Sequence, residues 1–113
     1  MTSPWGPQWY EMMLLFFPET TEEEQKQFME RLRELIEKHG GTLKEVETWG
    51  KRALSYPMEH RTEAIYVLVY FYVDRGATPE IDRFCRLDRR ILRHKIFRRE
   101  IPLKEEAPQE VQE

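Results

Sequence analysis

Residues 65–73 read Ile-Tyr-Val-Leu-Val-Tyr-Phe-Tyr-Val, and this stretch decides the fold. Its β-branched and aromatic residues favour an extended strand. Because successive side chains of a strand point to opposite faces, the two faces of this strand differ. One face carries Ile65, Val67, Val69, Phe71 and Val73, and the other carries Tyr66, Leu68, Tyr70 and Tyr72. We therefore expect helices to cover the first face and the tyrosines to lie on the open side of a sheet.

Three further strands are expected, two before this stretch in the sequence and one after it. They comprise residues 9–17, 43–58 and 91–101, and a polar turn at residues 59–63 separates the second strand from the third. Pro57 suits an edge strand better than a central one, because proline has no backbone N–H to donate. The second and fourth strands are therefore expected at the two edges of the sheet.

Two helices are expected between the strands. Thr21-Glu22-Glu23-Glu24 is a capping box with Thr21 as the N-cap, and Gly40-Gly41 ends this first helix. The second helix is predicted to start with Thr78 as its N-cap and Pro79 as its first residue, and to end near Asp88.

The predicted order is β-α-β-β-α-β, the α+β ferredoxin-like arrangement known as a split βαβ. Right-handed crossovers place both helices on the same face of a four-stranded antiparallel sheet. The usual spatial order of the four strands is 4-1-3-2. It places the first and third strands, residues 9–17 and 65–73, in the centre, and these are the two most apolar strands. It also places the second and fourth strands at the edges, as expected above.

Length and composition are those of a single domain, because 113 residues bury one core. We assign residues 9–101 to the domain, residues 1–8 to an irregular arm and residues 102–113 to an acidic, flexible tail. The N-terminus has the features of neither a signal peptide nor a transit peptide. No apolar run approaches the length of a membrane span. Cys85 is the one cysteine, so we expect it in the core, no disulfide, and a reducing intracellular compartment.

Charge is distributed unevenly along the chain. The formal net charge is −3, yet residues 83–99 contain eight Lys or Arg and one acidic residue. Solvated surface charge is the usual explanation of such a run, but self-repulsion among so many cations favours an anionic partner. Arginine is well suited to phosphate because its guanidinium binds in a bidentate manner.

A second cationic segment is Trp49-Gly50-Lys51-Arg52, which leads into Leu54-Ser55-Tyr56-Pro57-Met58. Glycine inside a strand suggests a β-bulge. Leu54, Tyr56 and Met58 would then share one strand face. The segment is either a kinked edge strand with solvated cations or a bulge that directs Lys51 and Arg52 at an anionic partner.

Catalytic and metal-binding patterns are weak in this sequence. His39, His60 and His94 have no spacing that suggests a metal site, and each is expected at the surface. No phosphate-binding glycine loop precedes a helix. We therefore expect a protein that is not an enzyme and has no cofactor, metal or small-molecule substrate.

Recognition of single-stranded RNA bases is also not favoured. The third strand lacks the glycine and the preceding cation of an RNA-recognition motif. Recognition of the shape and phosphates of structured RNA fits better. The tyrosine face is either a semi-exposed aromatic surface or a surface that a protein or nucleobases cover.

Several motifs occur in the order found in one known family. They are Tyr10-Glu11, Pro18, Gly40-Gly41, Trp49-Gly50-Lys51-Arg52, Leu54-Ser55-Tyr56-Pro57 and Leu87-Asp88-Arg89-Arg90-Ile91-Leu92-Arg93. Over residues 9 to about 100 the chain resembles the bacterial small-subunit ribosomal protein six family. Ala53 and Met58 depart from the family pattern, which usually has a polar residue and an isoleucine there.

The resemblance implies a cytoplasmic, ribosome-bound protein that binds the central domain of small-subunit rRNA. It also implies a heterodimer with small-subunit ribosomal protein eighteen, for which the interface candidates are Tyr66, Tyr70 and Tyr72. The candidate rRNA contacts are Lys51, Arg52, Arg89, Arg90 and Arg93, followed by Tyr10, Tyr56 and Arg99. Two alternatives remain: a regulatory or oligomerising domain that binds a small ligand on its open sheet face, and a dimeric α+β barrel enzyme.

Overall fold

A computed structural model describes residues 6–99 of the protein, so the tail assigned to residues 102–113 and most of the N-terminal arm lie outside the described residues. The elements in chain order are β1 (Pro7–Phe16), α1 (Glu22–Lys38), β2 (Thr42–Met58), β3 (Arg61–Asp74), the 3-10 helix η1 (Arg75–Ala77), α2 (Thr78–Leu87) and β4 (Ile91–Arg99). Strand β1 begins two residues before the predicted strand, within the expected arm. Neither α-helix in residues 6–99 is long and apolar enough to cross a membrane.

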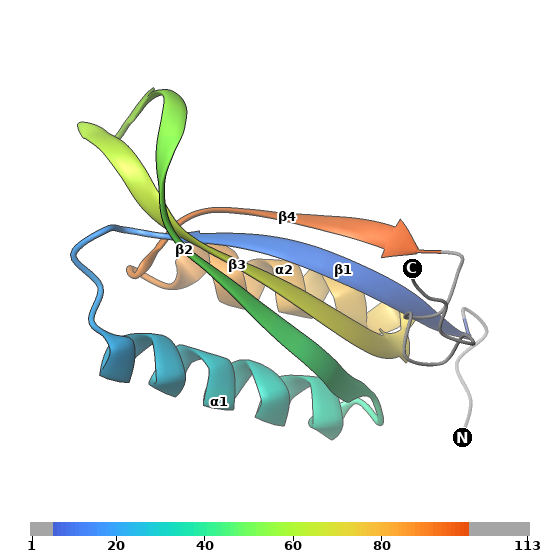
Figure 1. Ribbon diagram of the computed structural model, residues 1–113. Coiled ribbons are helices and arrows are strands. Elements are labelled where there is room, and N and C mark those ends of the chain that lie inside the picture. Colours follow the sequence, from blue (N-terminus) through green and yellow to red (C-terminus); the bar gives the residue numbers. More distant parts are fainter. Residues whose placement is uncertain (1–5, 100–113) are drawn as a thin grey trace, which may run out of the picture.

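The four strands form one antiparallel sheet in the order β2-β3-β1-β4. Both α-helices pack on the same face of this sheet (Figure 1). The predicted ferredoxin-like topology and strand order are therefore confirmed, with β3 and β1 in the centre.

The core lies between the helices and the covered face of the sheet. Helix α1 contributes Phe28, Leu32 and Ile36 at helical spacing, and α2 contributes Ile81 and Cys85. The predicted inner set of β3, from Ile65 to Val73 at every second residue, belongs to this core. The expectation that Cys85 is a core residue is confirmed, because its side chain is completely buried.

Helix α1 is bounded as its sequence predicts. The Thr21 hydroxyl accepts a hydrogen bond from the Glu24 backbone N–H at 3.1 Å, and the Glu24 carboxylate accepts one from the Thr21 N–H at 2.9 Å. After the helix, Gly40 has φ of +78°, a conformation that glycine adopts without strain. A Cβ atom on Gly41 would lie 2.4 Å from the Tyr72 carbonyl oxygen, so the chain needs glycine there to enter β2.

The β2–β3 hairpin is tighter than predicted. Its turn consists of Glu59 and His60, with φ of +47° and +64°, and β3 already begins at Arg61. Two-residue hairpin turns with positive φ usually contain glycine or asparagine, and neither is present here. The predicted five-residue turn is therefore wrong, because the turn lacks its usual sequence signal.

The start of α2 also differs from the prediction. Ala77 is the N-cap, and Thr78 is the first helical residue. Since η1 leads directly into the helix, the Thr78 hydroxyl donates to the Arg75 carbonyl at 2.9 Å instead of capping α2.

The core makes a first prediction about stability. Phe28 is completely buried between Phe16 and Phe84, so Phe28→Ala should lower the free energy of unfolding by about 3–5 kcal/mol. Leu87→Ala is the control, because Leu87 is 65% exposed and its truncation should change stability by less than about 0.5 kcal/mol. Urea unfolding measures both. Equal losses for the two variants would contradict this placement of the core.

Candidate nucleic-acid interface

A bulge interrupts β2 at Gly50. The register with β3 shifts between Thr48 and Gly50, and Gly50 has φ of +83°. The predicted bulge is confirmed. It places Trp49 on the open face, where its ring is stacked on Tyr66 with a centroid separation of 6.4 Å.

The two cations after the bulge lie on opposite sides of the edge strand. Lys51 is opposite Ile65, which belongs to the covered face, whereas Arg52 is opposite Ala64. The Arg52 guanidinium lies 5.5 Å from the centroid of the Trp49 ring and donates to the Trp49 carbonyl. Lys51 contributes to a lowered pKa of the Glu19 carboxyl, after a larger effect of the hydrogen bond from Arg61.

Arg90, at the junction of α2 and β4, is held by contacts within the protein. Its guanidinium binds both oxygens of Asp88, at 2.9 and 2.8 Å, and a third nitrogen donates to the Glu24 carbonyl at 3.1 Å. The guanidinium also lies over the ring of Phe28. Burial would raise the pKa of Asp88, but the hydrogen bonds and charge of Arg90 outweigh it and hold that pKa below its ordinary value. The hydrogen bond from Arg90 to the Glu24 carbonyl links the junction to the start of α1.

Arg89, the next residue along, is exposed. It lines a polar depression of about 380 Å³ together with Phe17, Glu19 and Arg61. Arg61 forms an ion pair with Glu19, and its guanidinium lies 5.0 Å from the centroid of the Phe17 ring. Arg61 was not among the site residues predicted from the sequence, because it fell within the predicted turn.

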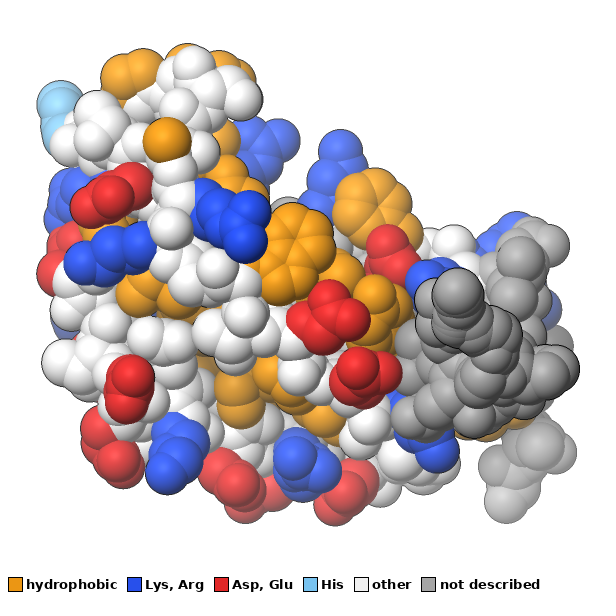
Figure 2. Space-filling model, in the orientation of Figure 1, with side chains coloured by type: hydrophobic (Ala, Val, Ile, Leu, Met, Phe, Trp, Pro, Cys, Tyr) orange, Lys and Arg blue, Asp and Glu red, His pale blue; other side chains and the backbone are white. Residues whose placement is uncertain are grey.

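Beside the hairpin, the open face of the sheet is hollowed. The β2–β3 hairpin extends past the end of the sheet and curls away from the helices (Figure 1). Leu54, Tyr56 and Met58 line one side of this hollow, as their predicted common face requires, and Arg93 lies on its β4 side. Figure 2 shows exposed hydrophobic side chains in this region with Lys or Arg side chains beside them.

Two predicted contacts lie elsewhere. Arg99 is six residues along β4 from Arg93, about 20 Å away, and it forms an ion pair with Glu11 at 2.7 Å. Tyr10 is 7% exposed and stacked on Phe71, and burial raises the pKa of its hydroxyl. Its side chain belongs to the covered face and presents little surface to RNA, so the RNA contact of Tyr10 stays a prediction that its burial does not favour.

Tyr66, Tyr70 and Tyr72 all lie on the open face. Tyr72 packs on Trp9 with a centroid distance of 4.9 Å, and Arg99 lies over Tyr70. Burial raises the pKa of Tyr70, with a further contribution from Glu47. The face is aromatic and half-exposed, and its rings contact one another and an arginine.

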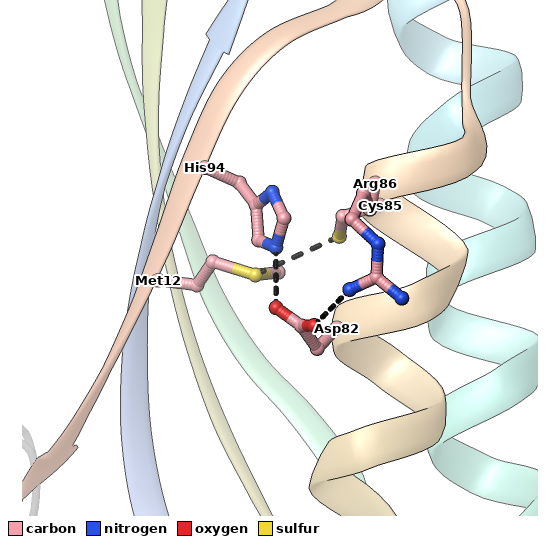
Figure 3. Close-up of polar contacts among 5 residues, drawn as sticks. All are labelled: Met12, Asp82, Cys85, Arg86 and His94. Atoms are coloured by element: carbon pink, nitrogen blue, oxygen red, sulfur yellow. Dashed lines mark hydrogen bonds and ion pairs between the residues drawn. The ribbon is translucent and has the colours of Figure 1, made fainter.

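His94 differs from the expected surface histidine. Its side chain is 12% exposed, and its Nε2 atom lies 2.7 Å from Oδ1 of Asp82 on α2 (Figure 3). This hydrogen bond is the main reason why the pKa of Asp82 is lowered, and Arg86 adds to the effect. The contact joins α2 to β4.

Metal-binding side chains are not clustered in the described part of the chain. Residues 6–99 contain no cluster of three His, Cys, Asp or Glu side chains that could hold a metal. The Cys85 sulfur lies 3.7 Å from the Met12 sulfur (Figure 3), and burial raises the pKa of the Cys85 thiol to about 12. This cysteine is therefore protonated at neutral pH, which makes it a poor nucleophile.

Comparison with known proteins identifies relatives along most of the chain. The family model described as "Ribosomal protein S6" matches residues 9–98. Small ribosomal subunit protein bS6 of Micrococcus luteus is 38% identical over 91 residues, which cover 80% of this chain and 90% of that protein. The same protein of Desulforamulus reducens is 36% identical over 89 residues, covering 79% and 94%. The crystal structure of 30S ribosomal protein S6 from Thermotoga maritima is 32% identical, with a TM-score of 0.76 and coverage of 83% and 89%.

The junction makes a second prediction about stability. Arg90→Ala should cost about 1–3 kcal/mol of unfolding free energy, because it leaves the half-buried Asp88 carboxylate without its main partner. Arg89→Ala is the matched control and should cost less than about 0.5 kcal/mol. Urea unfolding at neutral pH distinguishes the two arginines. An Arg90 variant as stable as the Arg89 variant would show that the ion pair does not support the fold.

Proposed function

Since this chain belongs to the ribosomal protein S6 family of the small ribosomal subunit, we propose that it binds the central domain of small-subunit rRNA as a heterodimer with ribosomal protein S18. The observation that carries the RNA part is the grouping of exposed cations at one end of the sheet. Lys51, Arg89 and Arg93 are exposed there, and they come from β2, the α2–β4 junction and β4.

The cations have the character of a phosphate-binding surface. They lie on several elements, and they follow the end of the sheet instead of forming one pocket. Backbone phosphates of a folded RNA present such a spread of negative charge. Arg52, Tyr56 and Arg61 border the same end and complete the proposed surface.

Arg90 has an indirect part in this proposal. Its contacts with Asp88 and Glu24 position the junction that carries Arg89. We therefore assign RNA contact to Arg89 and Arg93, and a positioning role to Arg90. Arg99 is left out of the RNA surface because it lies at the other end of β4.

The aromatic residues of the open face are the basis for proposing a protein partner. Tyr66, Tyr70 and Tyr72 form an aromatic surface with Trp9 and Trp49. Tyrosine and tryptophan are enriched in protein interfaces because their rings bury a large area while their polar atoms stay bonded. Binding of S18 on this face would bury the aromatic surface and leave Lys51 and Arg89, which lie off this face, free for RNA.

RNA binding makes a third prediction. If the protein neutralises about four phosphates, the logarithm of its rRNA affinity should fall against the logarithm of salt concentration with a slope of about 3 to 4. Arg93→Ala should weaken binding and reduce that slope by about 0.9. Arg33→Ala, an exposed arginine on α1, is the control and should change neither. Filter binding to small-subunit rRNA across a salt series gives both quantities; salt-independent affinity would refute the phosphate surface.

The protein interface makes a fourth prediction. Tyr72→Ala should weaken the heterodimer with S18 by about 2 kcal/mol, because it removes an aromatic side chain from the proposed interface. Val46→Ala is the control, since Val46 is 38% exposed, close to the 36% of Tyr72, but lies on the covered side of β2. Calorimetric titration with purified S18 measures both variants. Unchanged affinity for the Tyr72 variant would remove the tyrosine face from the interface.

A further inference from the structure

The hollow on the open face has a volume of about 310 Å³ and a mainly apolar lining. Its lining side chains include Met13, Leu15, Leu54, Met58 and Phe97. Phe97 is 44% exposed and Tyr56 is 56% exposed, although both rings border this space. A space of this kind suits one or two aliphatic side chains.

The edge of the hollow is cationic. Arg93 and Lys95 come from β4, and none of the described residues that line the space is acidic. Within residues 6–99 neither side chain forms an ion pair; Lys95 instead lies 5.8 Å from the centroid of the Phe97 ring. The complementary occupant is therefore a segment with aliphatic residues followed by acidic ones.

The chain itself contains such a segment. Residues 100–106 read Glu-Ile-Pro-Leu-Lys-Glu-Glu, which places two aliphatic residues between acidic groups. We propose that the C-terminal segment, residues 100–113, docks in this hollow of its own molecule. Ile101 and Leu103 enter the apolar space, and Glu105 and Glu106 pair with Arg93 and Lys95.

The segment is long enough for this arrangement. Strand β4 ends at Arg99, about 13 Å from Lys95 and about 20 Å from Arg93 along the strand. Leu103 and Glu106 lie four and seven residues after Arg99, so an extended chain can carry them about 13 Å and about 23 Å from it. A tight reversal directly after Arg99 therefore brings Leu103 to the level of Lys95 and Glu106 to that of Arg93, with Ile101 at the near rim beside Phe97.

Docking would shield part of the aromatic face of the free protein. Tyr66 lines the hollow and also belongs to the proposed S18 surface. The segment would thus compete with a partner for this end of the face. The inference goes beyond the proposed function and does not depend on it, because it concerns the isolated chain.

Methionine methyl NMR of the full chain provides the test. Met13 and Met58 line the hollow, whereas Met12 lies in the core and Met29 packs against it from α1. The double variant Ile101→Ser, Leu103→Ser should shift the methyl signals of Met13 and Met58 and leave those of Met12 and Met29 in place. Val111→Ser, an apolar substitution later in the same segment, is the control and should shift none of the four.

The charges are tested in the same spectra. Glu105→Lys with Glu106→Lys should shift the Met13 and Met58 signals in the same direction as the serine variant, and so should high salt. Signals that depend on protein concentration would place the segment of a second copy in the hollow and overturn docking within one molecule. Unchanged Met13 and Met58 signals in the serine variant would overturn docking altogether, and because the sample contains no RNA or S18, the proposed function would be unaffected.

Discussion

A sheet with both helices on one side leaves its other side in water, and the rest of this structure depends on that asymmetry. The covered side is a closely packed layer, in which Phe28 and Ile81 reach the sheet from the two helices. A wholly aliphatic open side would drive association, because it would expose a large area of hydrocarbon to water. Tyrosine is a compromise, since its ring packs on its neighbours while its hydroxyl stays hydrated.

The same asymmetry arranges the two proposed binding surfaces. The aromatic rings run along the open face from Tyr72 to Tyr66, and Tyr66 lies level with Arg93, where the exposed cations of β2, the α2–β4 junction and β4 begin. The two surfaces therefore meet at one end of the sheet, where an apolar partner and an anionic partner would be neighbours. This arrangement also accounts for a chain of negative net charge in a family of ribosomal proteins, because the local field at that end differs from the sum.

Adjacent arginines at the junction have different tasks. Asp88 binds the Arg90 guanidinium with both oxygens, and the Glu24 carbonyl takes a further N–H, so few donors of Arg90 remain for a ligand. Arg89 points into solvent at the neighbouring depression. A count of cations along the sequence treats the two residues alike. Only the position of Asp88 and of the end of α1 tells them apart.

Local pattern alone determined much of this protein. The alternation of β3, the capping box of α1 and the glycine bulge of β2 each depend on neighbours a few residues away, so they are readable from the sequence and are confirmed. The motifs shared with the S6 family likewise lie in sequence order. These features predicted the topology, the strand order and the two faces of the sheet.

Tertiary structure decided which side chains remain available. Tyr10 is in the core because register with β3 stacks it on Phe71, and His94 turns inward because Asp82 lies opposite it on α2. The hairpin turn at Glu59 and His60 has positive φ without glycine, which the pairing of β2 with β3 imposes. For Tyr10 and His94 the partner is distant in sequence, and burial and long-range pairing are properties of the assembled sheet that no local pattern contains.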